Sequence, residues 1–251
     1  MAFLYYQEIP SLVALVFKFV LLGYATRSST KTALSRLFLA FLVLLSLFNI
    51  VELGGMHYYY PRSLDVVVER FGFVYVGLMV LIVGGILHIS LRVSIDAAND
   101  PKWVRYLWLL YLPAVPLLGL LFFTDKLIVG FEPFKDSILR RPGPLYFLFE
   151  AYVVLYLMAA LANLVYGARS SRSPVVARIR NRLWLLALSP FFLMFVYLIL
   201  ASYVGLPRFT STFYFPIGIT FFLCVATYAI HEHRLFDLEF YIPWSKVRKR
   251  K

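Results

Sequence analysis

Long apolar runs follow one another along the chain, and polar or basic residues separate them. The runs cover residues 9–25, 34–53, 73–91, 103–123, 145–166, 183–204 and 213–230. A helix of roughly 20 apolar residues crosses the ~30 Å hydrocarbon core of a bilayer, whereas barrel strands alternate apolar and polar positions over roughly 10 residues. The pattern therefore predicts seven membrane-spanning helices. Prolines inside the fourth, sixth and seventh runs are expected to kink those helices, at Pro113, Pro116, Pro190 and Pro216.

The composition supports a membrane environment. The chain is 61% hydrophobic and 15% charged, with a mean hydropathy of +0.78, whereas soluble domains are roughly 45–50% apolar and about 25% charged. Lipid is thus the expected solvent, and helices satisfy their own backbone groups there. The predicted fold class is an all-α membrane protein, a seven-transmembrane helix bundle.

The basic residues between the runs predict the orientation. If the C-terminus is cytoplasmic, 17 of the 25 lysines and arginines lie on the cytoplasmic side and 7 lie outside, while Lys18 lies within the first run. Because cytoplasmic loops carry an excess of Lys and Arg, we expect the N-terminus outside and the C-terminus in the cytoplasm. The same bias explains the net charge of +12, so nucleic acid is not an expected partner.

Ionisable groups inside spans are costly and are therefore candidates for function. Glu52 ends the second run and Glu150 lies early in the fifth, so both fall in the outer half, and the loop after Glu52 carries His57, Tyr58 and Tyr59. Acidic and aromatic groups beneath an outer opening predict a pocket for a small cationic or hydroxylated ligand. The alternative interpretation makes Glu52 a water-contacting interfacial residue and the tyrosines an aromatic belt.

Two further polar residues, Lys18 and His88, lie within predicted spans. We expect Lys18 to pair with a carboxylate or carbonyl inside the bundle, or else to extend to an interface. His88 is expected to form a hydrogen bond between helices. His231 and His233 do not share a helix face, so neither a metal site nor another cofactor is predicted. Catalytic motifs based on a zinc-binding, nucleophilic-serine or phosphate-binding pattern are absent from the sequence, so no catalytic residue is predicted.

The exit from the seventh run is the most distinctive stretch. Residues 228–243 read YAIHEHRLFDLEFYIP, which predicts a helix that continues past Arg234 and Asp237 and ends at Pro243. A basic cluster follows, and it is expected to contact anionic lipid at about 1 kcal/mol per charge. The cluster consists of Lys246, Arg248, Lys249, Arg250 and Lys251.

This exit, together with FNIVELGG at residues 48–55 and VVVERFGFVYVG at residues 66–77, resembles the seven-transmembrane N-terminal sensor region of bacterial histidine kinases and related diguanylate cyclases. The resemblance implies a sensor domain over residues 1–233 and a juxtamembrane exit over residues 234–251 that leads to an output domain beyond this sequence. It also implies that Glu52 matches a recurring acidic position. The family's usual tryptophan earlier in that span is absent, and Phe48 is the candidate to replace it.

The leading hypothesis is a receptor module in the bacterial inner membrane. It detects an external or membrane-borne small ligand, transmits through the seventh span and forms a homodimer through the cytoplasmic part; any enzyme activity, kinase or cyclase, would belong to the full-length protein. A small transporter or channel that uses Lys18, Glu150 and His88 as a polar path is an alternative. A membrane anchor that senses the state of the bilayer itself is a third.

Overall fold

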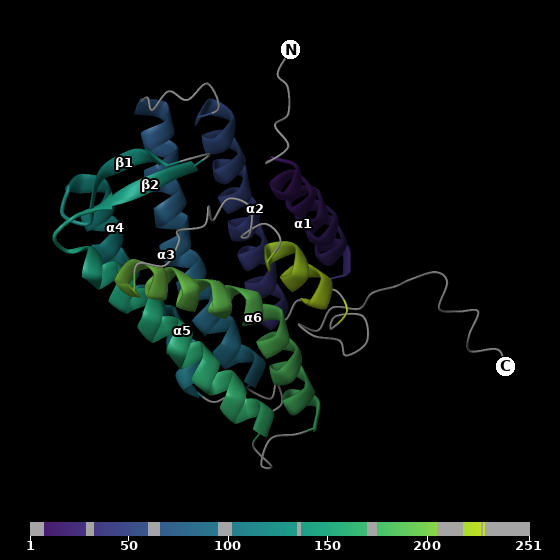
Figure 1. Cartoon of the computed structure of the whole chain (residues 1–251). Helices are drawn as coiled ribbons and strands as arrows, with labels where there is room; N and C mark the ends of the chain where they lie inside the picture. The colour runs from purple at the N-terminus through teal and green to yellow at the C-terminus, as the bar shows by residue number, and fades with distance from the viewer. Residues whose placement is uncertain are drawn as a thin grey trace.

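The computed structural model describes residues 8–28, 33–59, 66–94, 102–134, 137–169, 175–204, 218–226 and 228, and this part of the chain is helical apart from one hairpin (Figure 1). The helices and strands are α1 (Ile9–Ser28), α2 (Ala33–Tyr59), α3 (Val66–Ser94), the 3₁₀ helix η2 (Lys102–Tyr111), α4 (Ala114–Phe123), β1 (Ile128–Phe134), β2 (Ser137–Pro142), α5 (Tyr146–Arg169) and α6 (Val175–Val204). Residues 218–226 form a further short helix.

The predicted all-α membrane fold is confirmed. Five helical segments are long and apolar enough to cross a membrane, namely Ile9–Arg27, Leu34–Gly55, Val66–Ser94, Val104–Phe123 and Tyr146–Arg169. α6 covers the sixth apolar run, and residues 218–226 lie within the seventh. Several helices extend beyond their apolar runs, since backbone hydrogen bonding continues into the interface after the hydrophobic stretch has ended.

The contacts between helices fix their relative directions. The Tyr152 hydroxyl donates to the Val80 carbonyl oxygen, and Asn163 Nδ2 donates to the Ser90 carbonyl oxygen. From the first bond to the second, the residue number rises in α5, from 152 to 163, and in α3, from 80 to 90. The two helices therefore run parallel. Two helices that are parallel and separated by one intervening span agree with a chain that crosses the membrane repeatedly. Which end faces outside stays a prediction from the loop charges.

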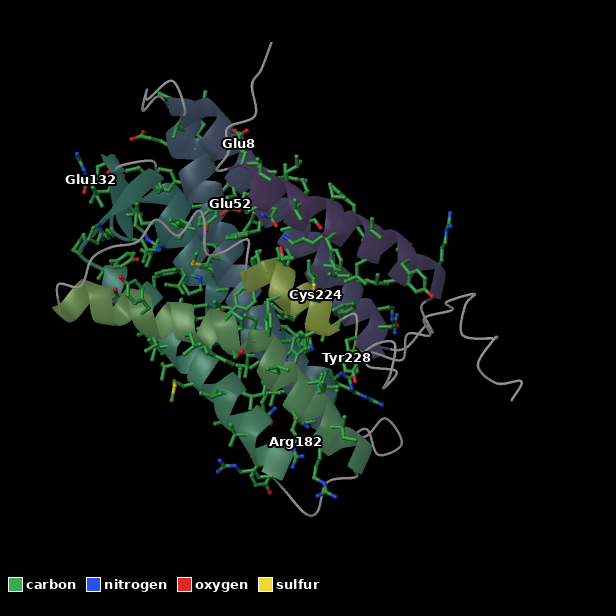
Figure 2. The ribbon with its side chains drawn as sticks, turned by 45° about the vertical axis from the view of Figure 1, so that its right-hand side comes forward. Glu8, Glu52, Glu132, Arg182, Cys224 and Tyr228 are labelled. Carbon is green, nitrogen blue, oxygen red and sulfur yellow. The ribbon has the colours of Figure 1, made fainter. Side chains whose placement is uncertain are left out.

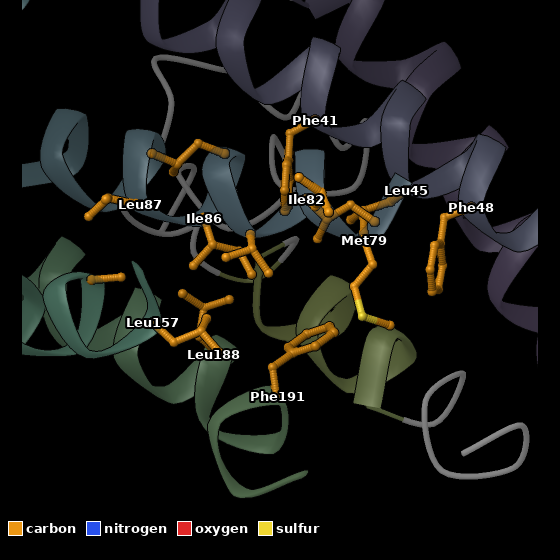
Figure 3. Packing of buried hydrophobic residues seen from close by; sticks show 14 of the residues in the cluster. Phe41, Leu45, Phe48, Met79, Ile82, Ile86, Leu87, Leu157, Leu188 and Phe191 are labelled. Carbon is orange, nitrogen blue, oxygen red and sulfur yellow. The ribbon is translucent and has the colours of Figure 1, made fainter. Parts of the chain in front are cut away.

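α3 is the central helix of the bundle. It contacts α2, η2, α4, β1, α5 and α6. Small residues permit close approach, because a Cβ at Gly72 would meet the Phe131 ring at 2.5 Å and one at Gly85 would meet the Phe41 ring at 2.9 Å. Apolar side chains from α2, α3, α5 and α6 fill the core around it (Figure 3), and they include Leu45, Phe48, Met79, Ile82, Ile86, Leu157, Leu188 and Phe191.

The fourth apolar run is a 3₁₀ helix followed by an α-helix rather than one continuous α-helix. Proline lacks an N–H group, so Pro113 cannot donate to the Leu109 carbonyl, which accepts from Leu112 N at 3.0 Å instead. For the same reason Pro116 cannot donate to the Leu112 carbonyl, which accepts from Val115 N at 3.1 Å. The predicted distortion at these prolines is confirmed. It takes the form of shorter turns, in which each of the two carbonyls accepts from the residue three positions later.

Side-chain hydroxyls bond to carbonyls that lie close before a proline. The Tyr156 hydroxyl donates to the Leu110 carbonyl oxygen at 2.6 Å, three residues before the proline that interrupts the fourth run. In α6, Ser189 Oγ donates at 2.7 Å to the carbonyl of Leu186, which lies four residues before Pro190. Such bonds are required in lipid, where an unsatisfied carbonyl has no water to accept from.

The purely helical prediction missed a β-hairpin between α4 and α5. β1 and β2 pair antiparallel, with Phe131 opposite Arg140 and Gly130 opposite Arg141. The hairpin lies beside α3 (Figure 1), where the Phe131 ring packs edge-to-face on Phe73 at a centroid distance of 5.2 Å. Strands this short, with arginines in one of them, read in the sequence as a polar loop, which is why the pattern of long apolar runs did not reveal them.

Candidate functional site around Glu52

Glu52 lies inside the bundle, near the end of α2 (Figure 2), with 5% of its surface exposed. Its Oε2 accepts hydrogen bonds from Ser11 Oγ at 3.0 Å and from Asn49 Nδ2 at 2.9 Å. Its Oε1 is buried and has no hydrogen-bond partner among the described residues, and the same holds for Asn49 Oδ1. Glu52 is therefore not the water-contacting interfacial residue of the alternative interpretation.

Lys18 is fully buried between α1 and α2. Its Nζ donates to the Leu45 carbonyl oxygen at 3.0 Å, and its charge attracts that of Glu52. The expected pairing inside the bundle is confirmed, and the alternative in which the amine extends to an interface is wrong. Because a lone buried charge is costly, the attraction between these two groups offsets part of the cost of burying each of them.

Tyr75 of α3 lies within electrostatic range of both Glu52 and Arg140 of the hairpin. Its ring packs on Phe48 at a centroid distance of 4.3 Å. Both the Glu52 carboxylate and the Arg140 guanidinium act electrostatically on the Tyr75 hydroxyl. An acidic group and a basic group are thus held near one tyrosine at the same end of the bundle.

Arg140 comes from the inward-facing side of β2. Its guanidinium lies 6.0 Å from the Tyr146 ring centroid and 5.7 Å from that of Phe149, both at the start of α5. The neighbouring Arg141 faces the other way, bonds to Glu132 Oε2 at 3.1 Å and is 60% exposed. This alternation follows from the two-residue period of a strand.

Glu150 lies on α5, half-buried at the same end, and its carboxylate acts electrostatically on Tyr146. The two predicted acidic residues thus lie near one set of aromatic residues, from α3 and α5. The sequence interpretation missed Arg140 because it treated the hairpin only as an outer loop, and it gave Tyr75 and Tyr146 no role because both lie within apolar runs. The two-residue period of a strand, which sets Arg140 and Arg141 on opposite faces, was the signal that could have revealed Arg140.

The remaining predicted positions are placed as follows. α2 extends through His57, Tyr58 and Tyr59, but their side chains lie outside the described residues. The signal exit at Arg234, Asp237 and Pro243 and the basic cluster from Lys246 to Lys251 also lie outside them.

His88 contacts η2 rather than the Glu52 site. Its Nδ1 lies 3.3 Å from the Tyr111 hydroxyl, which confirms the expected hydrogen bond between helices. Among the residues that the structure describes, no group of three or more His, Cys, Asp or Glu side chains could hold a metal ion.

A second polar network joins α3, α5 and α6 at the end of the bundle away from Glu52. Ser94 Oγ donates to Asn181 Oδ1 at 2.8 Å, and Asn163 Nδ2 donates to Ser94 Oγ at 3.0 Å and to the Ser90 carbonyl at 2.7 Å. Gly167 allows the approach, since a Cβ there would meet the Asn181 amide at 2.7 Å. Such a network holds membrane helices together, and it went unpredicted because serine and asparagine are not ionisable.

Comparison with known proteins agrees with this architecture. No curated protein and no solved structure matches the chain. The family described as the N-terminal 7TM region of histidine kinase matches residues 10–239. That region is a multi-pass membrane sensor and not a catalytic domain, as the resemblance in the exit segment implied. The chain therefore belongs to the seven-transmembrane N-terminal sensor regions of histidine kinases.

Proposed function

We propose that this sensor region detects a small external ligand at the end of the bundle that carries Glu52. The observation that supports the proposal is a buried carboxylate with one oxygen, Oε1, that no described residue bonds. An intramembrane carboxylate is costly, so its retention favours a functional role. The ligand would donate a hydrogen bond to Glu52 Oε1 and would pack against the Tyr75 ring.

The signal would pass along α2 to the last span. Glu52 and Phe41 are eleven residues apart, about three helical turns, and so share one face of α2. The Phe41 ring meets Phe222 edge-to-face at 6.2 Å, and Phe222 also contacts Trp184 at 5.1 Å and Phe191 at 6.0 Å. A shift of α2 would therefore repack the last helix. A ligand drives such a shift only by its difference in affinity between the two states.

The setting that we propose is the bacterial inner membrane, with the N-terminus outside and the C-terminus in the cytoplasm. Residues 234–243 would carry the movement to a kinase output domain, which would dimerise with a second copy. The basic cluster that follows would contact anionic lipid headgroups, since clustered Lys and Arg bind such membranes.

The test is autophosphorylation of the full-length kinase in proteoliposomes, across a panel of candidate stimuli. We expect Glu52→Gln to change basal output or abolish the response to the effective stimulus, and Glu150→Gln to weaken that response. Glu132→Gln is the matched control, because Glu132 is an exposed carboxylate that bonds outward to Arg141. If Glu52→Gln and Glu150→Gln both behave like Glu132→Gln, the outer site is not the input.

The transporter alternative makes a different prediction. The polar groups that it needs contact different partners, because Lys18 bonds to α2 and His88 bonds to Tyr111 of η2. A sensor region is expected to show no uptake of solute into proteoliposomes that contain this chain alone. Solute flux that Lys18→Met or His88→Phe abolishes would favour a transporter instead.

A further inference from the structure

The structure contains a buried hydrogen-bond donor at the outer end that the family assignment does not explain. Arg140 Nη1 is inaccessible to solvent and has no hydrogen-bond partner among the described residues. A guanidinium carries five N–H donors in a fixed planar fork. A buried donor without an acceptor is destabilising, and more so when it is charged.

The surroundings of Arg140 hold it in one place. The Tyr146 and Phe149 rings flank it, and such cation–π contacts restrict the guanidinium without using its N–H donors in hydrogen bonds. The base of the hairpin is tied down, since Gly143 N donates to the Leu127 carbonyl at 2.9 Å and Leu145 N donates to the Lys126 carbonyl at 2.8 Å. Arg140 is therefore positioned before any ligand arrives.

We propose that Arg140 binds an anionic group, a carboxylate or a phosphate, of the ligand that the outer end recognises. This proposal rests on the proposed function and adds the chemical class of the ligand. The planar fork of an arginine matches both oxyanions. The open acceptors at Glu52 Oε1 and Asn49 Oδ1 favour a hydrogen-bond donor elsewhere on the same ligand. Carboxylate and phosphate groups occur on soluble metabolites and on lipid headgroups, and the experiment separates these sources.

Thermal unfolding of the full chain in dodecyl maltoside micelles, which carry no phosphate or carboxylate, tests the proposal. One arm adds inorganic phosphate or acetate at constant ionic strength. The other arm adds phosphatidylglycerol to the micelles. We expect the wild type to gain several degrees in Tm in one arm, and that arm identifies the source. Arg140→Gln should lose that gain, while Arg140→Lys should keep only part of it.

Arg141→Gln is the matched control, because it removes the same charge from the adjacent residue on the opposite face of the strand. If Arg140→Gln and Arg141→Gln lose the Tm gain equally, or if neither arm produces a gain in the wild type, the proposal is wrong. The proposed sensing role can fail separately. If the Tm gain depends on Arg140 but Glu52→Gln leaves kinase output unchanged, Arg140 binds an anion and the site is not where the stimulus is detected.

Discussion

At the scale of single residues, Lys18 and Glu52 are two buried ionisable groups of opposite charge that attract each other. Removing one partner of a buried charge pair leaves the other uncompensated, at a cost of about 3 kcal/mol. We therefore expect Lys18→Met to lower the free energy of unfolding by that amount, measured by titration with sodium dodecyl sulfate. Lys126→Met, at an exposed position before the hairpin, should change little.

A double-mutant cycle measures the interaction between the two groups: it is present if the effects of Lys18→Met and Glu52→Gln on the free energy of unfolding are not additive. In a Glu52→Gln background, Lys18→Met should cost clearly less than in the wild type, because no buried carboxylate is then left without its counter-charge. Equal costs in both backgrounds would show that Lys18 acts only through its bond to the Leu45 carbonyl.

A second residue-scale prediction concerns Gly72, where the hairpin meets α3. A Cβ at Gly72 would lie 2.5 Å from the Phe131 ring, so Gly72→Ala must displace the ring, and overpacking of this kind costs about 1–3 kcal/mol. Gly119→Ala is the control, since nothing lies within 4 Å of a Cβ there. A thermal melt should show a loss for the first variant and no loss for the second; equal melting temperatures would mean that the ring moves freely.

At the scale of elements, the hydrogen bond from Tyr156 to the interrupted fourth span can be tested by its contribution to stability. Tyr156→Phe removes the hydroxyl that bonds the Leu110 carbonyl, and a buried acceptor left without a partner costs about 1–3 kcal/mol. Tyr166→Phe removes a hydroxyl from a side chain that is 69% exposed and should be neutral. Equal stability of the two variants would show that Leu110 finds another donor.

The helices and the hairpin also show which elements the sequence pattern predicted and which it did not. The long apolar runs predicted the helices, because crossing a bilayer demands one length and one composition. They predicted a distortion at Pro113, but not that the ten residues of η2 before this proline form a 3₁₀ helix, since the same apolar residues suit either kind of helix. The hairpin escaped because its pairing is set by contacts with α3, above all Phe131 on Gly72, which no local pattern reports. Arg140, and with it half of the candidate site, escaped for the same reason.

At the scale of the whole molecule, orientation can be tested by labelling. In a Cys224→Ser background, we expect Arg141→Cys in the hairpin to react with an impermeant maleimide in intact cells. Arg169→Cys, at the end of α5, should react only after the membrane is permeabilised, since the basic residues are expected inside. The opposite labelling pattern would reverse the predicted topology and place the Glu52 site at the cytoplasmic face.

The central position of α3 has a consequence for how members of this family can diverge. Successive glycines along α3 pack against different elements: Gly72 against the hairpin, Gly77 against α4 and Gly85 against α2. Each residue of a helix advances the direction of the side chains by about 100°. One inserted residue would therefore misdirect every contact beyond it. Aligned homologues should show α3 free of insertions and deletions, while length variation gathers in the loops and at the tip of the hairpin.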